Sequence, residues 1–353
     1  MRVVHLLLGT GTGTDPGLAG AVLPRDLVVA GQRWPKGRRL SPADLELLTR
    51  PGTAVASGRA IGPSGISLIV PDPGDIHEDE AALRLAGLVA GAGLEQRGPA
   101  ESRVDLLAAS DGVVHVRIGL LERLNRIDTI DVFTVYDGQV VRAGALVASA
   151  KIAPHLVEAA VLERAAGLVG PAGLVRVAPF TPRRVAAIVK ETVHPPVRER
   201  FEASVRLKVG ALGSSLVRVE YTEDTVEGVS RAFSAVSRTA DLILTAGSAS
   251  TDPSDPFFVA IERLGGEVVR HGVPAHPGSM LWLARLGRLD VLGLPTCGAY
   301  SKATAADLVL PRLLTGERVS RTLVAGLGHG GILSRSMRFR FPDYARELDE
   351  PDG

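Results

Sequence analysis

Residues 242–258 read LILTAGSASTDPSDPFF, an apolar run followed by a polar loop and the start of a helix. The run at 242–245 has the length and composition of a buried strand, and Phe257, Phe258, Ile261 and Leu264 have the apolar spacing of a helix. A plain connection between two such elements takes about four residues. The longer loop, rich in small hydroxyl residues and carrying two aspartates, therefore indicates a strand–loop–helix unit that holds a ligand.

Strand and helix patterns alternate on both sides of this unit. Strands are predicted at 185–189, 215–221, 242–245, 267–273 and 289–294, and helices near 198–212, 224–239, 257–264 and 303–314. Strands that alternate with crossover helices form a mostly parallel sheet covered on both faces. Residues 180–335 are therefore predicted as an α/β domain with a three-layer, doubly wound, mostly parallel sheet.

The first half of the chain has a different texture and is predicted as a β-rich α+β region over residues 1–175, in one or two subdomains. Helix starts are predicted at Ser41, which is followed by Pro42 and Asp44, and at residues 75–78. Asp-Gly pairs at 111–112 and 137–138 lie between apolar runs and predict two β-hairpins. The segment 151–170 is predicted as a helix, and residues 336–353 as a C-terminal tail.

The composition excludes several classes of protein. The chain of 353 residues has a net charge of +1 and 4% aromatic residues, which is unlike a nucleic-acid-binding protein. No run of about 18 apolar residues is present, so no membrane span is expected. A single cysteine forms no intrachain disulfide, which favours a reducing compartment. The sequence thus predicts a cytoplasmic protein that binds neither nucleic acid nor membrane.

Three loops of the predicted sheet are expected to form one cleft. In doubly wound sheets, ligands bind beyond the carboxyl ends of the strands. The loops at 190–192, 246–255 and 295–300 each follow a predicted strand. We therefore expect them to converge in space although they are far apart in the sequence.

The loop 246–255 has the chemistry of a phosphate-binding site. Small residues let a ligand approach the backbone, and the hydroxyls of Thr245, Ser248 and Ser250 can donate to phosphate oxygens. The pattern matches neither the P-loop nor the dinucleotide-binding fingerprint. A simple glycine–serine turn therefore remains the alternative.

The two aspartates of this loop differ in whether a structural role can explain them instead of metal binding. Asp255 precedes Pro256 and a helix, which is the position of an N-cap. Asp252 has no such structural role, and a carboxylate beside a phosphate site commonly holds a divalent cation. Both are candidate catalytic residues and metal ligands, with capping as the alternative for Asp255.

Further residues of the other loops are less specific. The stretch LGLPTCGAYSK at 292–302 offers Lys302 to an anion, and its Cys297 is either reactive or a small buried apolar residue. The stretch HPGSM at 276–280 has the composition of a tight turn. His329, in a glycine-rich turn, is left open as a ligand.

Taken in order, these motifs resemble the molybdopterin-binding family. The resemblance rests on DLILTAGSASTDPSDPFFVAIERLGGEVVRHGVPAHPGSMLWLA at 241–284 and DVLGLPTCGAYSKATAADLVLPRLLTGE at 290–317, and it extends to VLPRDLVV at 22–29 and PGDIHEDEAALRLA at 73–86. This family includes the molybdotransferase that completes molybdenum cofactor and the gephyrin E domain. The likeness is nearer to stand-alone bacterial members associated with molybdenum hydroxylases such as xanthine dehydrogenase.

The resemblance implies that the doubly wound domain binds the pterin dithiolene through its phosphate, in free, adenylylated or molybdenum-loaded form. It assigns Asp252 and Asp255 to a Mg²⁺ ion or to molybdate. The cofactor-binding residues that it implies are Lys190, Glu191, Thr245, Gly247, Ser248, Ser250, His276, Pro277, Gly278, Ser279, Pro295, Thr296, Cys297, Gly298 and Lys302. A homodimer is also implied.

The loops depart from those of the molybdotransferase. Its TGG loop corresponds here to residues 245–247, TAG, and its basic PGKP turn to a turn with His276 and Ser279. Its GDE and LPGNP motifs correspond to KET at 190–192 and LPTCG at 294–298. These departures favour retention of the pocket over retention of the reaction.

Three functions remain open from the sequence. The first is insertion of molybdate into the cofactor, with catalysis mostly by positioning and charge. The second is a non-catalytic carrier that delivers the cofactor to an apo-molybdoenzyme. The third is a nucleotide-dependent enzyme on the same fold, since a phosphate site does not name its ligand.

Overall fold

The second half of the chain is built on a six-stranded sheet. Its strands are β15 (Arg184–Lys190), β16 (Ser215–Thr222), β17 (Leu242–Ala246), β18 (Glu267–His271), β19 (Trp282–Leu286) and β20 (Leu289–Gly293), in the order β16–β15–β17–β20–β19–β18. The structure is a computed structural model that describes residues 1–11, 15–56, 65–190, 195–295 and 303–346. The strands β16, β15, β17 and β20 run parallel, which confirms the mostly parallel sheet.

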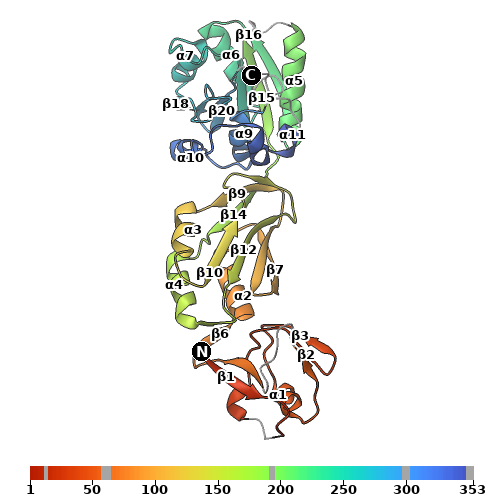
Figure 1. Ribbon diagram of the computed structural model, residues 1–353. Coiled ribbons are helices and arrows are strands. Elements are labelled where there is room, and N and C mark those ends of the chain that lie inside the picture. Colours follow the sequence, from red (N-terminus) through yellow and green to blue (C-terminus); the bar gives the residue numbers. More distant parts are fainter. Residues whose placement is uncertain (12–14, 57–64, 191–194, 296–302, 347–353) are drawn as a thin grey trace. The chain divides into compact units, whose positions relative to one another are not determined.

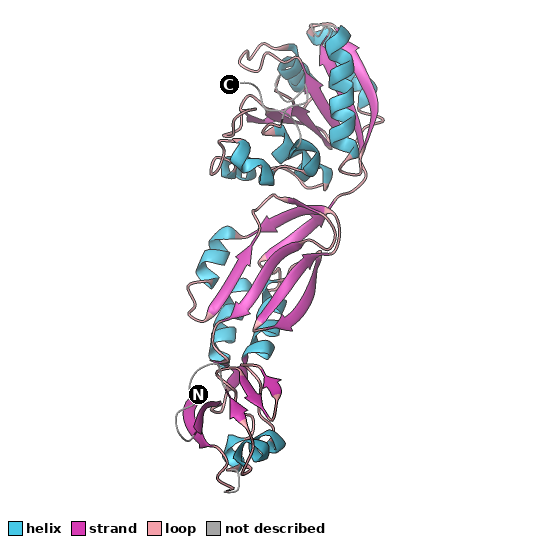
Figure 2. Ribbon diagram, turned by 45° about the vertical axis from the view of Figure 1, so that its right-hand side comes forward, coloured by secondary structure: helices cyan, strands magenta, loops and turns pink. Residues whose placement is uncertain are grey.

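Helices cover both faces of this sheet (Figures 1 and 2). They are α5 (Pro195–Gly210), α6 (Val226–Val236), α7 (Pro256–Arg263) and α9 (Ala306–Leu314). Side chains of a strand alternate between faces, and in β15 Val185, Ala187 and Val189 pack in one core with α5 and α9. Ala186 and Ile188 pack in the other core with α6 and α7. The three-layer doubly wound architecture is therefore confirmed.

The edge of the sheet that contains β19 was not predicted. β19 runs antiparallel to β20, and β18 runs antiparallel to β19. Leu286 pairs with Leu289 across a two-residue turn in which Gly287 has a φ of 61°. Such a short turn joins antiparallel strands only, whereas the parallel pairs need helical crossovers. The prediction missed the turn because it carries Gly-Arg instead of a strong hairpin dipeptide.

The chain ends in short helices that pack on this domain. They are α10 (Arg321–Gly326), the 3₁₀ helix η2 (Arg335–Arg340) and α11 (Asp343–Arg346). Phe341 and Ala345 are buried in the core shared with α5 and α9. The described part of the segment predicted as a tail therefore contributes to the core.

The first half is rich in strands, as predicted. Its elements are β1 (Arg2–Leu7), η1 (Pro16–Leu18), β2 (Leu27–Val29), β3 (Gln32–Trp34), α1 (Pro42–Thr49), β4 (Val55–Ala56), β5 (Gly65–Val70), β6 (Asp75–His77), α2 (Glu78–Val89), β7 (Leu94–Ala100), β8 (Arg103–Ala108), β9 (Gly112–Val116), α3 (Ile118–Leu124), β10 (Ile130–Thr134), β11 (Val140–Val141), β12 (Leu146–Ile152), β13 (Leu156–Glu158), α4 (Ala159–Val169) and β14 (Val175–Pro179). The largest sheet has the order β10–β12–β8–β7, and smaller sheets are β3–β2–β4, β11–β9–β14, β1–β5 and β13–β6.

Two of its helices begin where the sequence indicates. The Ser41 hydroxyl accepts from the Asp44 amide at 3.2 Å, and the Asp44 carboxylate accepts from the Ser41 amide at 2.9 Å, which closes the capping box of α1. The second helix, α2, begins at Glu78. Residues 75–77 form β6, so the helix starts later than Asp75. Its cap is His77, whose Nδ1 accepts from the Asp79 amide at 3.2 Å.

Both predicted hairpins are wrong. β8 and β9 flank Asp111-Gly112 but do not pair: β8 pairs with β12, and β9 pairs with β11. β10 and β11 flank Asp137-Gly138, and β10 also pairs with β12. Each Asp-Gly pair instead lies where the chain leaves one sheet and enters another. The predicted helix at 151–170 is also too long, because residues up to 158 lie in β12 and β13 and α4 begins at Ala159.

The chain divides into two units. The first comprises residues 1–107, 116–134 and 146–176, and the second comprises 108–115, 135–145 and 177–353. Two segments of the first half therefore belong with the six-stranded sheet. Within the ranges that the structure describes, no helix is long and apolar enough to cross a membrane.

Candidate functional site

The described parts of the predicted loops lie at one edge of the six-stranded sheet. The adjacent strands β15, β17 and β20 are parallel, and Val189 pairs with Ala246 and Thr245 with Gly293. Their carboxyl ends are therefore neighbours. The loop between β18 and β19, residues 272–281, is at the same edge, since Trp282 pairs with Gly293. Glu191, Thr296, Cys297, Gly298 and Lys302 lie outside the described residues.

The loop after β17 begins at an exposed glycine. Gly247 is exposed and has a φ of 90°, a region that side-chain-bearing residues seldom adopt. The Ser248 hydroxyl lies 3.1 Å from the Ser250 hydroxyl. A ligand at this edge can therefore approach the backbone at Gly247 and find the hydroxyl of the half-buried Ser248 beside it.

Trp282 fixes the position of Ser248. Its indole Nε1 donates to the Ser248 hydroxyl at 3.1 Å. The indole lies directly against Gly293, where an added Cβ would clash with the ring. His271 contributes as well, because its Nε2 bonds the carbonyl of Ser250. The sequence analysis did not find Trp282, since it did not predict the strand that Trp282 begins.

Asp252 is an exposed carboxylate in the same loop. Its Oδ1 accepts from the Ser254 amide at 2.8 Å and from the Ser254 hydroxyl at 2.6 Å. These two hydrogen bonds lower the pKa of Asp252 below its ordinary value. The side chain is therefore ionised at neutral pH and faces solvent, as a ligand for a cation must.

Asp255 is placed differently, because its carboxylate is buried and its two oxygens accept from the chain itself. Oδ1 accepts from the Phe257 amide at 2.9 Å, which is the N-cap of α7. Oδ2 accepts from the Ala249 amide at 2.6 Å and from Lys190 Nζ at 2.7 Å. This geometry matches the capping alternative for Asp255.

Lys190, the last residue of β15, connects three loops. Its Nζ lies 2.7 Å from Asp255 Oδ2 and 2.7 Å from Asp224 Oδ1, and its side chain is 2% exposed. Asp224 follows β16, the fourth parallel strand. The rule that selected the other loops applies equally to that strand end and would have found it.

The turn at 276–280 lies against the start of α9. The Ala305 amide donates to the Pro277 carbonyl at 2.9 Å. A Cβ on Gly278, whose φ is 103°, would come within 2.8 Å of the Ala305 amide nitrogen. His276 is exposed and Ser279 half-buried, whereas Pro295 is buried. The turn is thus fixed by its glycine, and His276 is the residue that it presents.

Thr245 ends the buried part of β17. Its side chain is fully buried, and within the described ranges its hydroxyl has no hydrogen-bond partner. A buried hydroxyl without a partner is costly. Thr245 precedes the loop directly in the sequence, but its hydroxyl is buried, whereas Gly247 and Asp252 are exposed. His329, which the sequence left open, is exposed.

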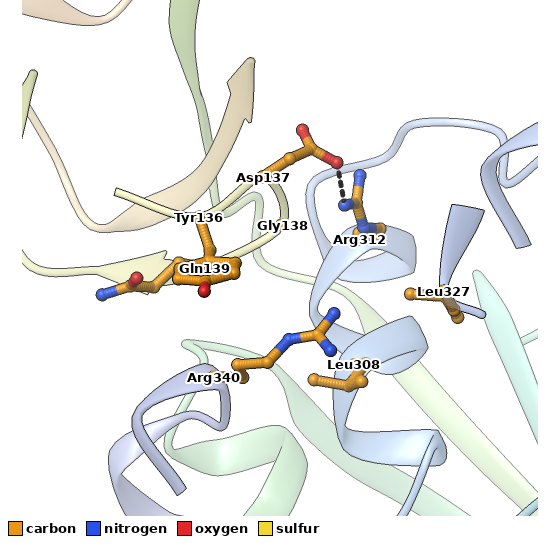
Figure 3. Close-up of a pocket in the computed structure, with 8 residues that line it drawn as sticks. All are labelled: Tyr136, Asp137, Gly138, Gln139, Leu308, Arg312, Leu327 and Arg340. Atoms are coloured by element: carbon orange, nitrogen blue, oxygen red, sulfur yellow. Dashed lines mark hydrogen bonds and ion pairs between the residues drawn. The ribbon is translucent and has the colours of Figure 1, made fainter. Parts of the chain in front are cut away.

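A small pocket lies elsewhere in the same unit (Figure 3). It is lined by Tyr136, Asp137, Gly138, Gln139, Leu308, Arg312, Leu327 and Arg340. Arg312 Nη2 donates to Asp137 Oδ2 at 2.8 Å. Arg340 is buried, and this burial lowers the pKa of its guanidinium; the positive charge of Arg312 acts in the same direction. The volume is about 10 Å³, which is room for about one water molecule and not for a cofactor.

No cluster of three or more His, Cys, Asp or Glu side chains suited to a metal ion occurs within the described ranges. The described part of the carboxyl edge therefore offers an exposed glycine, hydroxyl groups and the exposed carboxylate of Asp252.

Comparisons with known proteins give the family of the domain. Residues 184–315 match the family described as probable molybdopterin binding domain. No curated protein matches the chain. Among solved structures, the molybdopterin biosynthesis MoeA protein from Pyrococcus horikosii is 16% identical, over 68% of this chain and 79% of that chain, with a TM-score of 0.32.

Two further solved structures are similar at the same low level. The molybdopterin biosynthesis enzyme MoaB from Thermus thermophilus is 18% identical, over 38% of this chain and 98% of that chain, with a TM-score of 0.29. A molybdenum cofactor biosynthesis protein from Pyrococcus furiosus is 14% identical, over 69% and 65%, with a TM-score of 0.25. The family match includes every strand of the sheet and the loops at its carboxyl edge. Residues 184–315 of this chain thus form a domain of the molybdopterin-binding family.

Proposed function

We propose that this protein binds molybdopterin at the carboxyl edge of its six-stranded sheet and carries the cofactor during maturation of molybdenum enzymes. The observation that carries the proposal is the placement of the loops. Within the region that matches the family, residues 184–315, the ends of β15, β17 and β20 are adjacent. The free, adenylylated and molybdenum-loaded forms of the cofactor all carry the phosphate that this edge suits.

The phosphate is the part of the ligand that the loop after β17 would hold. Gly247 is exposed with a φ of 90°, and Ser248 supplies a hydroxyl that accepts from Trp282. Small residues with positioned hydroxyls and accessible backbone bind phosphate oxygens well. His276, exposed on the neighbouring turn, would contact the same ligand from the side of α9.

A divalent cation fits this edge at Asp252 and does not fit at Asp255. Asp252 is ionised and exposed, with its Oδ1 accepting from Ser254. Asp255 has both oxygens engaged by Phe257, Ala249 and Lys190, so a metal ion there would have to displace the lysine. A cation at Asp252 would supply charge stabilisation for a phosphate or an oxyanion.

The first expected result is that the protein contains pterin when it is produced in a host that makes the cofactor. The purified protein is denatured, the released small molecules are oxidised, and the fluorescent pterin is measured against protein by mass spectrometry. We expect pterin at a substantial fraction of one mole per mole. A bound nucleotide without pterin would instead support the nucleotide-dependent enzyme on the same fold.

The second candidate function, molybdate insertion, is favoured by one observation, the ionised carboxylate of Asp252 at the loop. The test is molybdenum incorporation into a purified apo-hydroxylase, with metal-free or adenylylated pterin as donor. A carrier gives no insertion above background, and Asp252→Asn then changes only pterin affinity. Mg²⁺-dependent insertion that is lost in Asp252→Asn would establish the transferase instead.

A further inference from the structure

The ion pairs at the end of β15 have the arrangement of a small cation site. Lys190 Nζ lies 2.7 Å from a carboxylate oxygen of Asp224 and 2.7 Å from one of Asp255. The lysine side chain is 2% exposed and that of Asp255 is 0% exposed. Proteins also hold divalent cations between two carboxylates that point at one positive centre. Here the positive centre belongs to the chain itself.

The lysine determines the shape of the loop that carries the candidate site. Asp255 Oδ2, which accepts from Lys190, also accepts from the Ala249 amide at 2.6 Å. Asp255 Oδ1 caps α7 through Phe257, and the Asp255 amide donates to the Asp252 carbonyl at 3.1 Å. Both ends of the segment 249–255 are thus fastened to one carboxylate, and that carboxylate is neutralised by Lys190.

Lys190 is well fitted to remain in this position. Its ammonium lies 5.3 Å from the centre of the Phe257 ring, so an aromatic face adds to the attraction of the two carboxylates. A buried carboxylate needs a nearby positive charge, because burial without a partner is strongly unfavourable. A metal ion at Asp255 would have to displace an ammonium group that already meets this need.

We propose that the Lys190 ammonium takes the place of a divalent cation between Asp224 and Asp255, so that the loop 246–255 keeps its shape without any metal ion. Lys190 is a positioning residue for the loop. Where the loop binds the pterin, which rests on the function proposed above, the consequence is that no metal ion at Asp255 is needed to hold the binding loop in shape.

The test uses the full-length protein without its ligand. Melting temperature is measured in EDTA, in Mg²⁺ and in Mn²⁺, and bound Mn²⁺ is counted by electron paramagnetic resonance. We expect the wild type to melt at the same temperature in all three and to bind no Mn²⁺ that depends on Asp255. Lys190→Ala is expected to melt at a lower temperature in EDTA and to be restored by Mn²⁺, which fills the space between the carboxylates.

Two variants separate metal rescue from general effects. Lys190→Ala combined with Asp224→Asn removes one carboxylate, and Mn²⁺ should no longer restore its melting temperature. Lys208→Ala is the matched control, because Lys208 is also buried and its ammonium pairs with the carboxylate of Asp307. It should lose stability without any rescue by Mn²⁺.

Two results would overturn the proposal. One is wild-type Mn²⁺ binding that disappears in Asp255→Asn, and the other is a folded Lys190→Ala whose melting temperature is the same with and without Mn²⁺. If Lys190→Ala does not fold, the wild-type metal measurements still decide. Pterin binding by the wild type, compared in EDTA and in Mg²⁺, is scored separately. Failure to bind pterin in either buffer counts against the proposed function and leaves the metal result standing.

Discussion

Replacing Asp307 with alanine is expected to destabilise the second unit by about 3–5 kcal/mol. Asp307 is fully buried on α9, and its Oδ1 and Oδ2 lie 2.8 and 3.0 Å from Lys208 Nζ. The Tyr344 hydroxyl donates to Oδ1 at 3.1 Å, and the Thr304 amide donates to Oδ2 at 2.9 Å. Alanine would leave the Lys208 ammonium buried without this carboxylate, which is strongly unfavourable.

The free energy of unfolding in urea measures this loss. Trp282 is the tryptophan of the second unit, and a Trp34→Phe background leaves it as the only tryptophan of the chain. The double variant Lys208→Met with Asp307→Leu removes both charges and should be less destabilised than Asp307→Ala alone. A loss below about 1 kcal/mol for Asp307→Ala would show that water reaches this pair.

The second large effect is expected on ligand binding. Gly247→Val should lower pterin affinity at least tenfold, about 1.4 kcal/mol or more in binding free energy. The added side chain would stand on the exposed turn that is proposed to hold the phosphate. The φ of 90° at Gly247 also makes any side chain strained, so a stability loss of roughly 1–2 kcal/mol should accompany the change.

Gly265→Val is the matched control for the backbone strain. Gly265 follows α7 with a φ of 75°, and a Cβ there meets nothing within 4 Å. It should cost a similar amount of stability with pterin affinity unchanged. Affinity is measured by titration with metal-free pterin under anaerobic conditions. An equal loss of affinity in both variants would reduce Gly247 to a structural turn.

Several features of the molecule depend on neighbours in the sequence, and these were predictable. The capping box at Ser41 involves residues three apart, and the Asp255 cap involves residues two apart. The alternation of apolar strands with amphipathic helices indicated the three-layer sheet. A strand that is apolar throughout is buried on both faces, and an amphipathic helix buries one face against the sheet. Ligands bind beyond the carboxyl ends of the strands in such sheets, and this rule placed the loops after β15, β17 and β20 together without any knowledge of side-chain contacts.

Features that depend on distant partners were not predictable. Asp-Gly at 111–112 and 137–138 does turn the chain, but the strands on either side pair with β11 and β12. A local turn preference is small beside the burial gained by pairing with a strand elsewhere. The same holds for β19 (Trp282–Leu286), which was not predicted as a strand.

The role of Asp255 shows the division most clearly. Its place before Pro256 indicated a cap, and its place in a polar loop with a phosphate pattern indicated a metal ligand, and nothing in the loop decided between them. The decision comes from Lys190, 65 residues earlier, and from Asp224, both brought to the loop by parallel strand pairing. Local sequence sets hydrogen bonds within a turn or a helix cap. The partner of a buried charge is set by which strand ends meet, and only the tertiary structure brings those ends together.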